Sequence, residues 1–299
     1  MSSSASPVTA GAATSGVLSA GTPAPQAAPA ASSARKVRGH RRPGEGSTTA
    51  ISIATVVVLC VLWWAAAALA WLPPLVLPSP ASVWDAFVAA VKGQGQGGKP
   101  LLEHFLWSLG RVFGAFALAC VTAIPVGILM GTSRVMRGVF DPIIEFYRPL
   151  PPLAYLPLVI IWFGIEETSK VVLIYLACFA PLAVAARAGV KSVGSEQINA
   201  ALSLGASRWQ VVRHVVLPAA LPDILTGMRI AIGFGWTTLV AAEMVAATAG
   251  LGQLVLNASN FLRTDVVVMG IIVIGIVALL FDLLMRRIEG WLVPWKGRM

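Results

Sequence analysis

Six apolar stretches, separated by polar or basic connectors, constrain this chain more than any other feature of its sequence. They cover residues 51–72, 106–130, 141–165, 171–188, 228–247 and 266–285. The hydrocarbon core of a bilayer is about 30 Å thick, and about 20 apolar residues in a helix are needed to cross it. Because lipid offers no hydrogen-bond partner to the backbone, only helices and closed barrels can cross it. The stretches therefore predict an all-α, polytopic membrane protein with six transmembrane helices.

The composition excludes an ordinary soluble domain. Charged residues make up 12% and hydrophobic residues 57% of the 299 residues, whereas soluble domains carry about 25% charged residues. A net charge of +9 would suggest nucleic-acid binding in a soluble chain. Here the basic residues flank apolar stretches, so membrane orientation explains them and no nucleic-acid partner is expected. Cys60, Cys120 and Cys178 lie inside apolar stretches without metal-site spacing, and we interpret them as packing residues.

Changes in composition divide the chain into four parts. Residues 1–48 are rich in Ala, Ser and Pro and should form a disordered cytoplasmic tail that ends in a basic anchor. Residues 49–103 should hold the first transmembrane helix and an outer loop with a short interfacial helix. Residues 104–288 form the expected membrane core, with a long loop at 190–227, and residues 289–299 form a cytoplasmic C-terminal tail.

Arginine and lysine gather in alternate connectors. If the N-terminus is cytoplasmic, six crossings leave only Lys92, Lys99, Lys170 and Arg263 among the outer connectors. The inner side would then hold Arg35, Lys36, Arg38, Arg41, Arg42, Arg134, Arg137, Arg187, Lys191, Arg208, Arg213, Arg229, Arg286, Arg287, Lys296 and Arg298. The positive-inside rule therefore predicts that both termini and the loop at 190–227 are cytoplasmic.

Two of the stretches allow a second interpretation. Small residues near the end of 51–72 fit the pattern of signal-peptide cleavage, so a removed leader is the alternative to a first transmembrane helix. In 141–165, five prolines interrupt the first half and remove backbone donors that lipid cannot replace. Such backbone fits a position beside protein or a watery cavity, which is where we expect this element to lie. The alternative is an interfacial re-entrant corner.

Between the fourth and fifth stretches lies an orderly polar and basic segment, residues 195–227, which we call the elbow. Its apolar residues recur at helical spacing on both sides of Gly205. Gly205 stands where a turn between two short helices needs a residue free of Cβ constraint. Ser207 can cap the second helix, and Pro218 and Pro222 are expected to end the unit. The sequence thus predicts a helix–turn–helix attached to the membrane core.

The chain shows no nucleotide-binding motif in a suitable context. Residues 93–99 nearly match the phosphate-binding loop Gly-x4-Gly-Lys. Pro100 replaces the Ser or Thr that would hold magnesium, and no hydrophobic strand precedes the segment. We interpret it as a flexible outer loop, so this chain is not expected to bind its own ATP.

The elbow resembles the cytoplasmic coupling loop of ABC-importer permeases. The resemblance rests on the spacing Ala-Ala-x3-Gly-x9-hydrophobic-x-Leu-Pro, which is formed by Ala200, Ala201, Gly205, Val215, Leu217 and Pro218. Asn199 stands where the family usually has Glu, so any ion pair made by that carboxylate is not expected here.

Further strings between residues 72 and 297 narrow the resemblance. They include Asp-Pro-Ile-Ile-Glu-Phe-Tyr-Arg at 141–148, Trp-Phe-Gly-Ile-Glu-Glu-Thr-Ser-Lys at 162–170 and Leu-Val-Ala-Ala-Glu at 239–243. They are similar to the permeases of taurine and aliphatic-sulfonate importers. The permeases for nitrate and for thiamine precursors (pyrimidines) are near relatives and remain the alternatives for the substrate.

The resemblance implies a type I ABC-importer permease fold, a homodimeric pore and a place in the bacterial inner or plasma membrane. It implies two copies of a separate ATPase, which carries the ATP and Mg²⁺, and a periplasmic or lipid-anchored substrate-binding protein. This chain would then be a pore subunit without enzymatic activity or a bound cofactor. The elbow residues that would meet the ATPase are Asn199, Ala200, Ala201, Gly205, Ala206, Ser207, Leu217 and Pro218.

Candidate residues of the translocation path come from the third and fifth stretches: Tyr147, Arg148, Tyr155, Trp236, Thr237 and Glu243. An ionised carboxylate inside a membrane helix is costly unless it is paired or hydrated. We therefore expect Arg148 and Glu243 to line a wet cavity, where Arg148 would meet a sulfonate and Glu243 an ammonium group. The alternative is that Glu243 forms a structural ion pair or lies at the membrane interface.

Two other classes of membrane protein fit less well. A secondary transporter would be expected to carry an ion-coupling site and often an internal repeat, and neither is visible. A membrane enzyme would need converging catalytic groups, but His40, His104 and His214 are scattered along the chain.

Overall fold

The computed structural model describes residues 49–94 and 98–293, and these residues form helices and connecting turns without a strand. The chain divides into a unit Met1–Ile51 and a unit Ser52–Met299, and the second holds nearly everything discussed below. The predicted tail at 1–48 and residues 294–299 lie outside the described residues, as do residues 95–97 of the expected outer loop.

Among the described residues, five helices are long and apolar enough to cross a membrane. They are α1 (Thr49–Ala68), α3 (Leu101–Thr132), α6 (Glu167–Lys191), α9 (Leu217–Ala246) and α11 (Thr264–Leu292). α3, α6 and α11 contain the second, fourth and sixth predicted stretches, α1 covers the first as far as Ala68, and α9 covers all but the last residue of the fifth. The prediction of an all-α, multi-pass membrane protein is therefore confirmed.

The third predicted crossing is wrong as a single helix. It consists of α4 (Arg134–Tyr147) and α5 (Pro152–Phe163), with a turn at 148–151 between them. Pro149 and Pro151 explain the break, because each removes a backbone donor and disfavours helical geometry in the residue before it. With 12 residues, α5 is about 18 Å long and too short to cross the hydrocarbon core alone.

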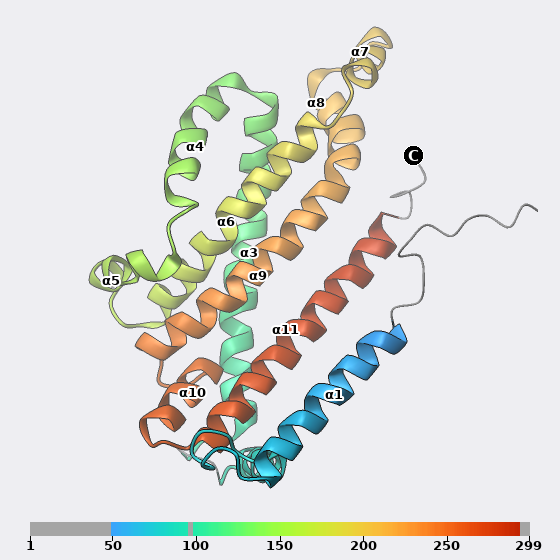
Figure 1. The fold of residues 1–299 in the computed structure, drawn as a ribbon. Coiled ribbons are helices and arrows are strands. Elements are labelled where there is room, and N and C mark those ends of the chain that lie inside the picture. The colour runs from blue at the N-terminus through green and yellow to red at the C-terminus, as the bar shows by residue number, and fades with distance from the viewer. Residues whose placement is uncertain (1–48, 95–97, 294–299) are drawn as a thin grey trace, which may run out of the picture. The chain divides into compact units, whose positions relative to one another are not determined.

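The core is formed by α3, α6 and α9, which run side by side (Figure 1). Close approach depends on residues without a bulky side chain. A Cβ on Gly127 of α3 would collide with the carbonyl oxygen of Ala183 and the Cβ of Ala186 in α6. A Cβ on Gly227 of α9 would collide with the Cβ of Ala185. Small residues at such positions are what allows membrane helices to pack tightly.

The short helices lie around this core. α2 (Pro80–Val91) is the short helix expected in this interval; Ser79 precedes it and its hydroxyl accepts from Ser82 N, and the helix buries Val83, Ala86 and Ala90. These residues pack with α10 (Leu251–Asn260) and the start of α11. At the other end of α9 lie α7 (Ser195–Ser203) and α8 (Arg208–Val211), as Figure 1 shows.

The fifth crossing begins earlier than its apolar stretch suggests. We expected Pro218 and Pro222 to end the elbow, but α9 runs through both from Leu217. A single π-helical turn, η1 (Val212–Val216), joins α8 to α9 immediately before Pro218. Pro218 lacks the N–H that an α-helix would use, and a local π turn is one way to accommodate such a lost bond. The elbow is therefore continuous with the transmembrane helix.

Packing in this core predicts different effects for two glycines of the same helix. Gly127→Ala should lower the unfolding free energy by about 1–3 kcal/mol, because overpacking forces neighbours to shift. Gly110→Ala is the matched control, since a Cβ at Gly110 has no atom within 4 Å. Thermal unfolding of both variants in detergent tests this prediction. Equal unfolding temperatures would contradict the packing described for α3 and α6.

Candidate functional site

The elbow has the helix–turn–helix geometry that its sequence predicts. Helix α7 ends at Ser203, and the chain turns at Gly205, whose φ of 83° lies in the left-handed region that favours glycine. Ser207 then starts α8 with a complete capping box. Its hydroxyl accepts from Gln210 N at 3.3 Å, and the Gln210 side chain accepts from Ser207 N at 2.8 Å.

One face of the elbow is packed and the other is open. Val211 and Val216 are buried against Ala186 and Val190 at the end of α6, which fixes the elbow to the core. On the open face, Leu204 is 89% and Trp209 71% exposed. These two large apolar side chains stand at the end of a membrane protein where polar residues would be expected. Such exposed apolar groups, with basic neighbours, are typical of a protein–protein contact.

The structure brings the predicted docking residues together on this elbow. Most of them are exposed, while Ala201 and Ala206 are half-buried. Asn199 and Ala200 lie in the second half of α7, and Leu217 and Pro218 begin α9. Their contact with an ATPase stays a prediction, because it concerns another protein.

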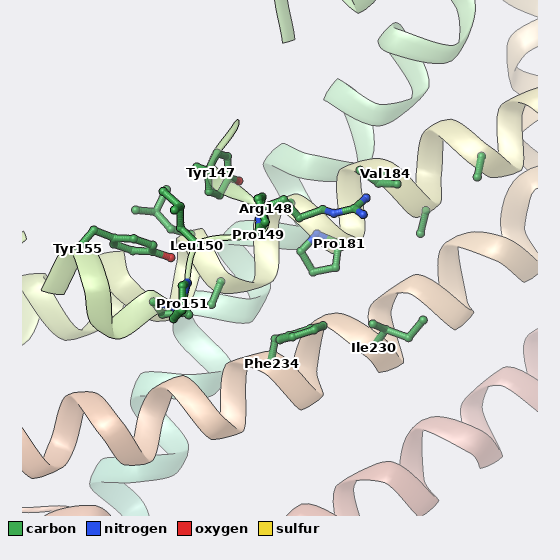
Figure 2. Close-up of a pocket in the computed structure, with 16 residues that line it drawn as sticks. Tyr147, Arg148, Pro149, Leu150, Pro151, Tyr155, Pro181, Val184, Ile230 and Phe234 are labelled. Carbon is green, nitrogen blue, oxygen red and sulfur yellow. The ribbon is translucent and has the colours of Figure 1, made fainter. Parts of the chain in front are cut away.

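A cavity of about 510 Å³ lies beside the broken third crossing (Figure 2). Its wall is made by the α4–α5 corner, by the middle of α6 and by Ile230 and Phe234 of α9. Apolar groups dominate the wall, and its lining residues include one cation, Arg148, and no carboxylate. In Figure 2, the Arg148 side chain extends along α6 towards Val184. The cavity thus suits an anion that carries an apolar part.

The predicted path residues do not all meet at this cavity. Tyr147, Arg148 and Tyr155 line it, and the Tyr147 hydroxyl is buried without a hydrogen-bond partner among the described residues. Trp236 belongs instead to the core between α3, α6 and α9. Thr237 is exposed, and its hydroxyl donates to the Phe234 carbonyl oxygen. Neither lines the cavity.

Glu243 forms a structural ion pair, which was the alternative interpretation, and its partner is Arg111 instead of Arg148. Its side chain is 0% exposed, and its Oε1 accepts from Arg111 at 2.8 Å and from the Ser108 hydroxyl at 2.7 Å. The expected meeting of Glu243 with Arg148 in a wet cavity is therefore wrong. The carboxylate is satisfied by a buried cation, which is the arrangement that a dry environment requires.

Arg111 also binds a second carboxylate. Its Nε and one terminal nitrogen donate to the two oxygens of Glu167, at 2.6 and 2.9 Å, and Lys170 donates to Glu167 at 2.8 Å. Together, Ser108, Arg111, Glu167, Lys170 and Glu243 form what we call the charge network. It joins α3, α6 and α9 and contains two formal positive and two formal negative charges.

The charge network was not predicted, although the sequence contains a signal for it. Arg111 and Glu243 both stand inside apolar stretches, and each needs a partner there. Opposite charges in two different transmembrane stretches are candidates for pairing with each other. Arg148 was favoured because it lies in the broken third crossing, but the fold directs it to the cavity.

The elbow geometry predicts that Gly205 is the position most sensitive to substitution there. Gly205→Asp should leave the membrane abundance unchanged and reduce uptake, because the chain folds but its turn is strained and carries a side chain on the docking face. Gly205→Ala tests the backbone contribution, since Ala tolerates positive φ less well than Asp and carries no charge. Gly194→Ala is the control: its φ is −61° and no atom lies near its Cβ position. Normal uptake by Gly205→Asp at equal abundance would contradict the docking role.

The chain is similar in sequence to permease proteins of known transport systems. Over 247 residues, the chain is 54% identical to the taurine transport system permease protein TauC of Escherichia coli strain K12, covering 83% of this chain and 90% of that protein. It is 34% identical over 240 residues to the putative aliphatic sulfonates transport permease protein SsuC of the same strain, covering 80% and 89%.

A solved structure supports the fold. The MetNI methionine ABC transporter in an inward-facing conformation matches with a TM-score of 0.56 at 20% identity, over 64% of this chain and 95% of the matched chain. At that identity, the likeness concerns the fold alone. Residues 123–294, which include the elbow and the cavity, match the family model of the binding-protein-dependent transport system inner membrane component. The chain belongs to this family of membrane transport components.

Proposed function

We propose that this chain is the pore subunit of an ATP-driven importer for taurine or a related sulfonate. The observation that carries the proposal is the 54% identity to TauC along 90% of the length of that protein. The cavity supports it, because its one lining cation, Arg148, stands in an apolar wall. A sulfonate with a short carbon chain has the matching chemistry, an anion attached to an apolar body.

The assembly that we propose contains two copies of this chain, two copies of an ATPase and a periplasmic or lipid-anchored substrate-binding protein. The elbow supports the ATPase contact through its packed inner face and its exposed Leu204 and Trp209. ATP and Mg²⁺ would be held by the ATPase, so this chain itself is not an enzyme in the proposal. Substrate selection would be shared with the binding protein, which lets the pore bind its substrate weakly.

In the proposed mechanism, ATP draws the paired ATPases together and moves the docked elbows. Since the elbow is continuous with α9 and packed on the end of α6, this motion reaches the transmembrane helices directly. The helices then alternate between outward-open and inward-open states, to which ATP and substrate bind with different affinities.

The position of Glu243 means that taurine would be recognised differently from the sequence-based expectation, in which Glu243 binds the ammonium group. Glu243 is buried in the charge network and cannot meet the ammonium group at the cavity in this state. Arg148 alone would then bind the substrate by charge, through the sulfonate. On this basis the pore would accept alkyl sulfonates that lack an amino group, and discrimination for taurine would depend on the binding protein.

The first test is uptake by proteoliposomes that contain this chain with its ATPase and binding protein. Taurine uptake should require ATP, and Arg148→Gln should reduce it about tenfold, because a hydrogen bond to a charged group is lost. Arg148→Lys should retain part of the activity, since it keeps the charge but not the planar fork. Arg137→Gln is the control, because this exposed arginine of α4 does not line the cavity.

Other outcomes identify the alternatives. Uptake of nitrate or a pyrimidine, but not of taurine, would show that the substrate is that of a near relative and not a sulfonate. Uptake driven by an ion gradient without ATP would indicate a secondary transporter. Unchanged taurine uptake by Arg148→Gln would contradict the assignment of the anion to this cavity.

The proposed orientation places both termini and the elbow in the cytoplasm and α10 outside. Basic residues of the elbow support it through the positive-inside rule. In a background without Cys60, Cys120 and Cys178, a membrane-impermeant thiol reagent should label Ser259→Cys in intact cells. Arg213→Cys should react only after permeabilisation. Labelling of Arg213→Cys in intact cells would show that the elbow lies outside and would contradict the proposed orientation.

A further inference from the structure

The start of α10 is held by side chains from two transmembrane helices. Its first backbone amides have no acceptor within the helix itself. Leu251 N donates to Ser108 Oγ and Gly252 N to Glu243 Oε2, each at 2.9 Å. His104 Nδ1 lies 3.0 Å from both the amide nitrogen and the carbonyl oxygen of Gly250, and its tautomer decides which of the two it bonds. All three side chains are buried. Helix α10 is therefore capped from inside the protein, where water does not compete.

Arg111 links this cap to the rest of the helix bundle. Besides Glu243 and Glu167, it donates to the Ala249 carbonyl oxygen at 2.6 Å, in the turn that leads into α10. One guanidinium thus contacts the end of α9, the start of α6 and the entry to α10. Charge-assisted bonds with such geometry fix relative positions as well as adding stability.

The backbone at the start of α10 packs in close contact with the end of α9. Gly250 has a φ of 143°, and a Cβ there would collide with the Glu243 carboxyl group. At Gly252, a Cβ would lie 2.6 Å from the Val240 carbonyl oxygen and 2.9 Å from Glu243 Cβ. The backbone of α10 therefore rests directly on the last turns of α9. Displacement of α10 relative to α9 requires the buried carboxylate to lose its partners.

The two carboxylates of the network differ in exposure. The Glu243 side chain is 0% exposed, whereas Glu167 is 44% exposed although both bind Arg111. Exposed ion pairs are weak, because water and salt screen them, and a buried pair is costly to break on one side only. The strong connection is therefore between Arg111 and Glu243, on the side of α9 and α10.

From this geometry we infer that Glu243 and Arg111 are positioning residues, which fasten α10 to α3 and α9 so that motion started at the elbow is carried to the far end of the permease. Figure 1 shows that the elbow helices and α10 lie at opposite ends of α9. The inference rests on the proposed ATP-driven transport. It adds that transport depends on this cap and that the cap does not bind the substrate.

Glu243→Gln is the most direct variant. Glutamine keeps one carbonyl oxygen, which can accept from Gly252 N, but its amide NH2 replaces the oxygen that accepts from Ser108 and Arg111, and the charge that binds Arg111 is lost. In the reconstituted complex, taurine uptake should fall about tenfold, because a charge-assisted bond is lost, while ATP hydrolysis per complex stays close to that of the wild type. Glu103→Gln is the matched control: it makes the same chemical change at the start of α3, where it removes a partly exposed ion pair with Lys99, and both activities should stay unchanged.

A merely structural role for Glu243 predicts a different pattern. Uptake and hydrolysis would then fall together, in proportion to the amount of folded complex. That proportional loss, or normal uptake by Glu243→Gln, would overturn the inference. If Glu243→Gln does not fold, Arg111→Lys replaces it, because lysine keeps the charge and loses the fork that spans two carboxylates. Arg111→Lys should show the same separation of uptake from hydrolysis, and a proportional loss would overturn the inference there too.

Hydrogen exchange separates this inference from the proposed function. The Gly252 amide should exchange about tenfold faster in Glu243→Gln, because a neutral amide oxygen replaces the carboxylate that accepts from it, and it should exchange at the wild-type rate in Glu103→Gln. This measurement needs no transport. If the wild-type complex fails to move taurine, the proposed function fails while the exchange still tests the cap. Unchanged exchange in Glu243→Gln would refute the fastening of α10.

Discussion

The close packing of α3, α6 and α9 is the constraint on which the rest of the structure depends. Lipid tails are as apolar as leucine, so membrane helices gain little from hydrophobic attraction and must fit closely instead. Gly127 and Gly227 allow contacts that a Cβ would prevent. Gly189 contributes likewise, with its missing Cβ 2.9 Å from the Ala220 carbonyl oxygen. Helices in such contact are expected to move together, because packed cores do not deform continuously.

Polar groups are concentrated at the two ends of this packed body. At one end the elbow joins α9 through η1, without a flexible linker. At the other end Arg111 and Glu243 hold α10. The cavity with Arg148 lies between α9, α6 and the α4–α5 corner. An ATPase contact at the elbow and an outer segment at α10 would therefore be connected by one rigid unit, beside a cavity that can hold an anion.

The sequence predicts well what depends on neighbouring residues. The Ser207–Gln210 capping box, the Gly205 turn and the five long helices follow from local patterns. The sequence predicts less well the contacts between residues that are far apart in the chain. Arg111 and Glu243 are 132 positions apart, and nothing local determines that they meet. Proline does not end the helix at Pro218, because a π turn accommodates the lost hydrogen bond. Between α4 and α5, proline does break the helix.

The central claim, that the elbow and α10 move as one body, is open to direct measurement. Spin labels at Arg213 of the elbow and Ser259 of α10 in one protomer, paired with an unlabelled copy in the reconstituted complex, report the distance between the elbow and α10. Double electron–electron resonance with and without ATP should give distances that agree within about 2 Å, the size of ordinary helix shifts. A change of about 5 Å or more, one helical turn, in a complex that still transports taurine would contradict the account.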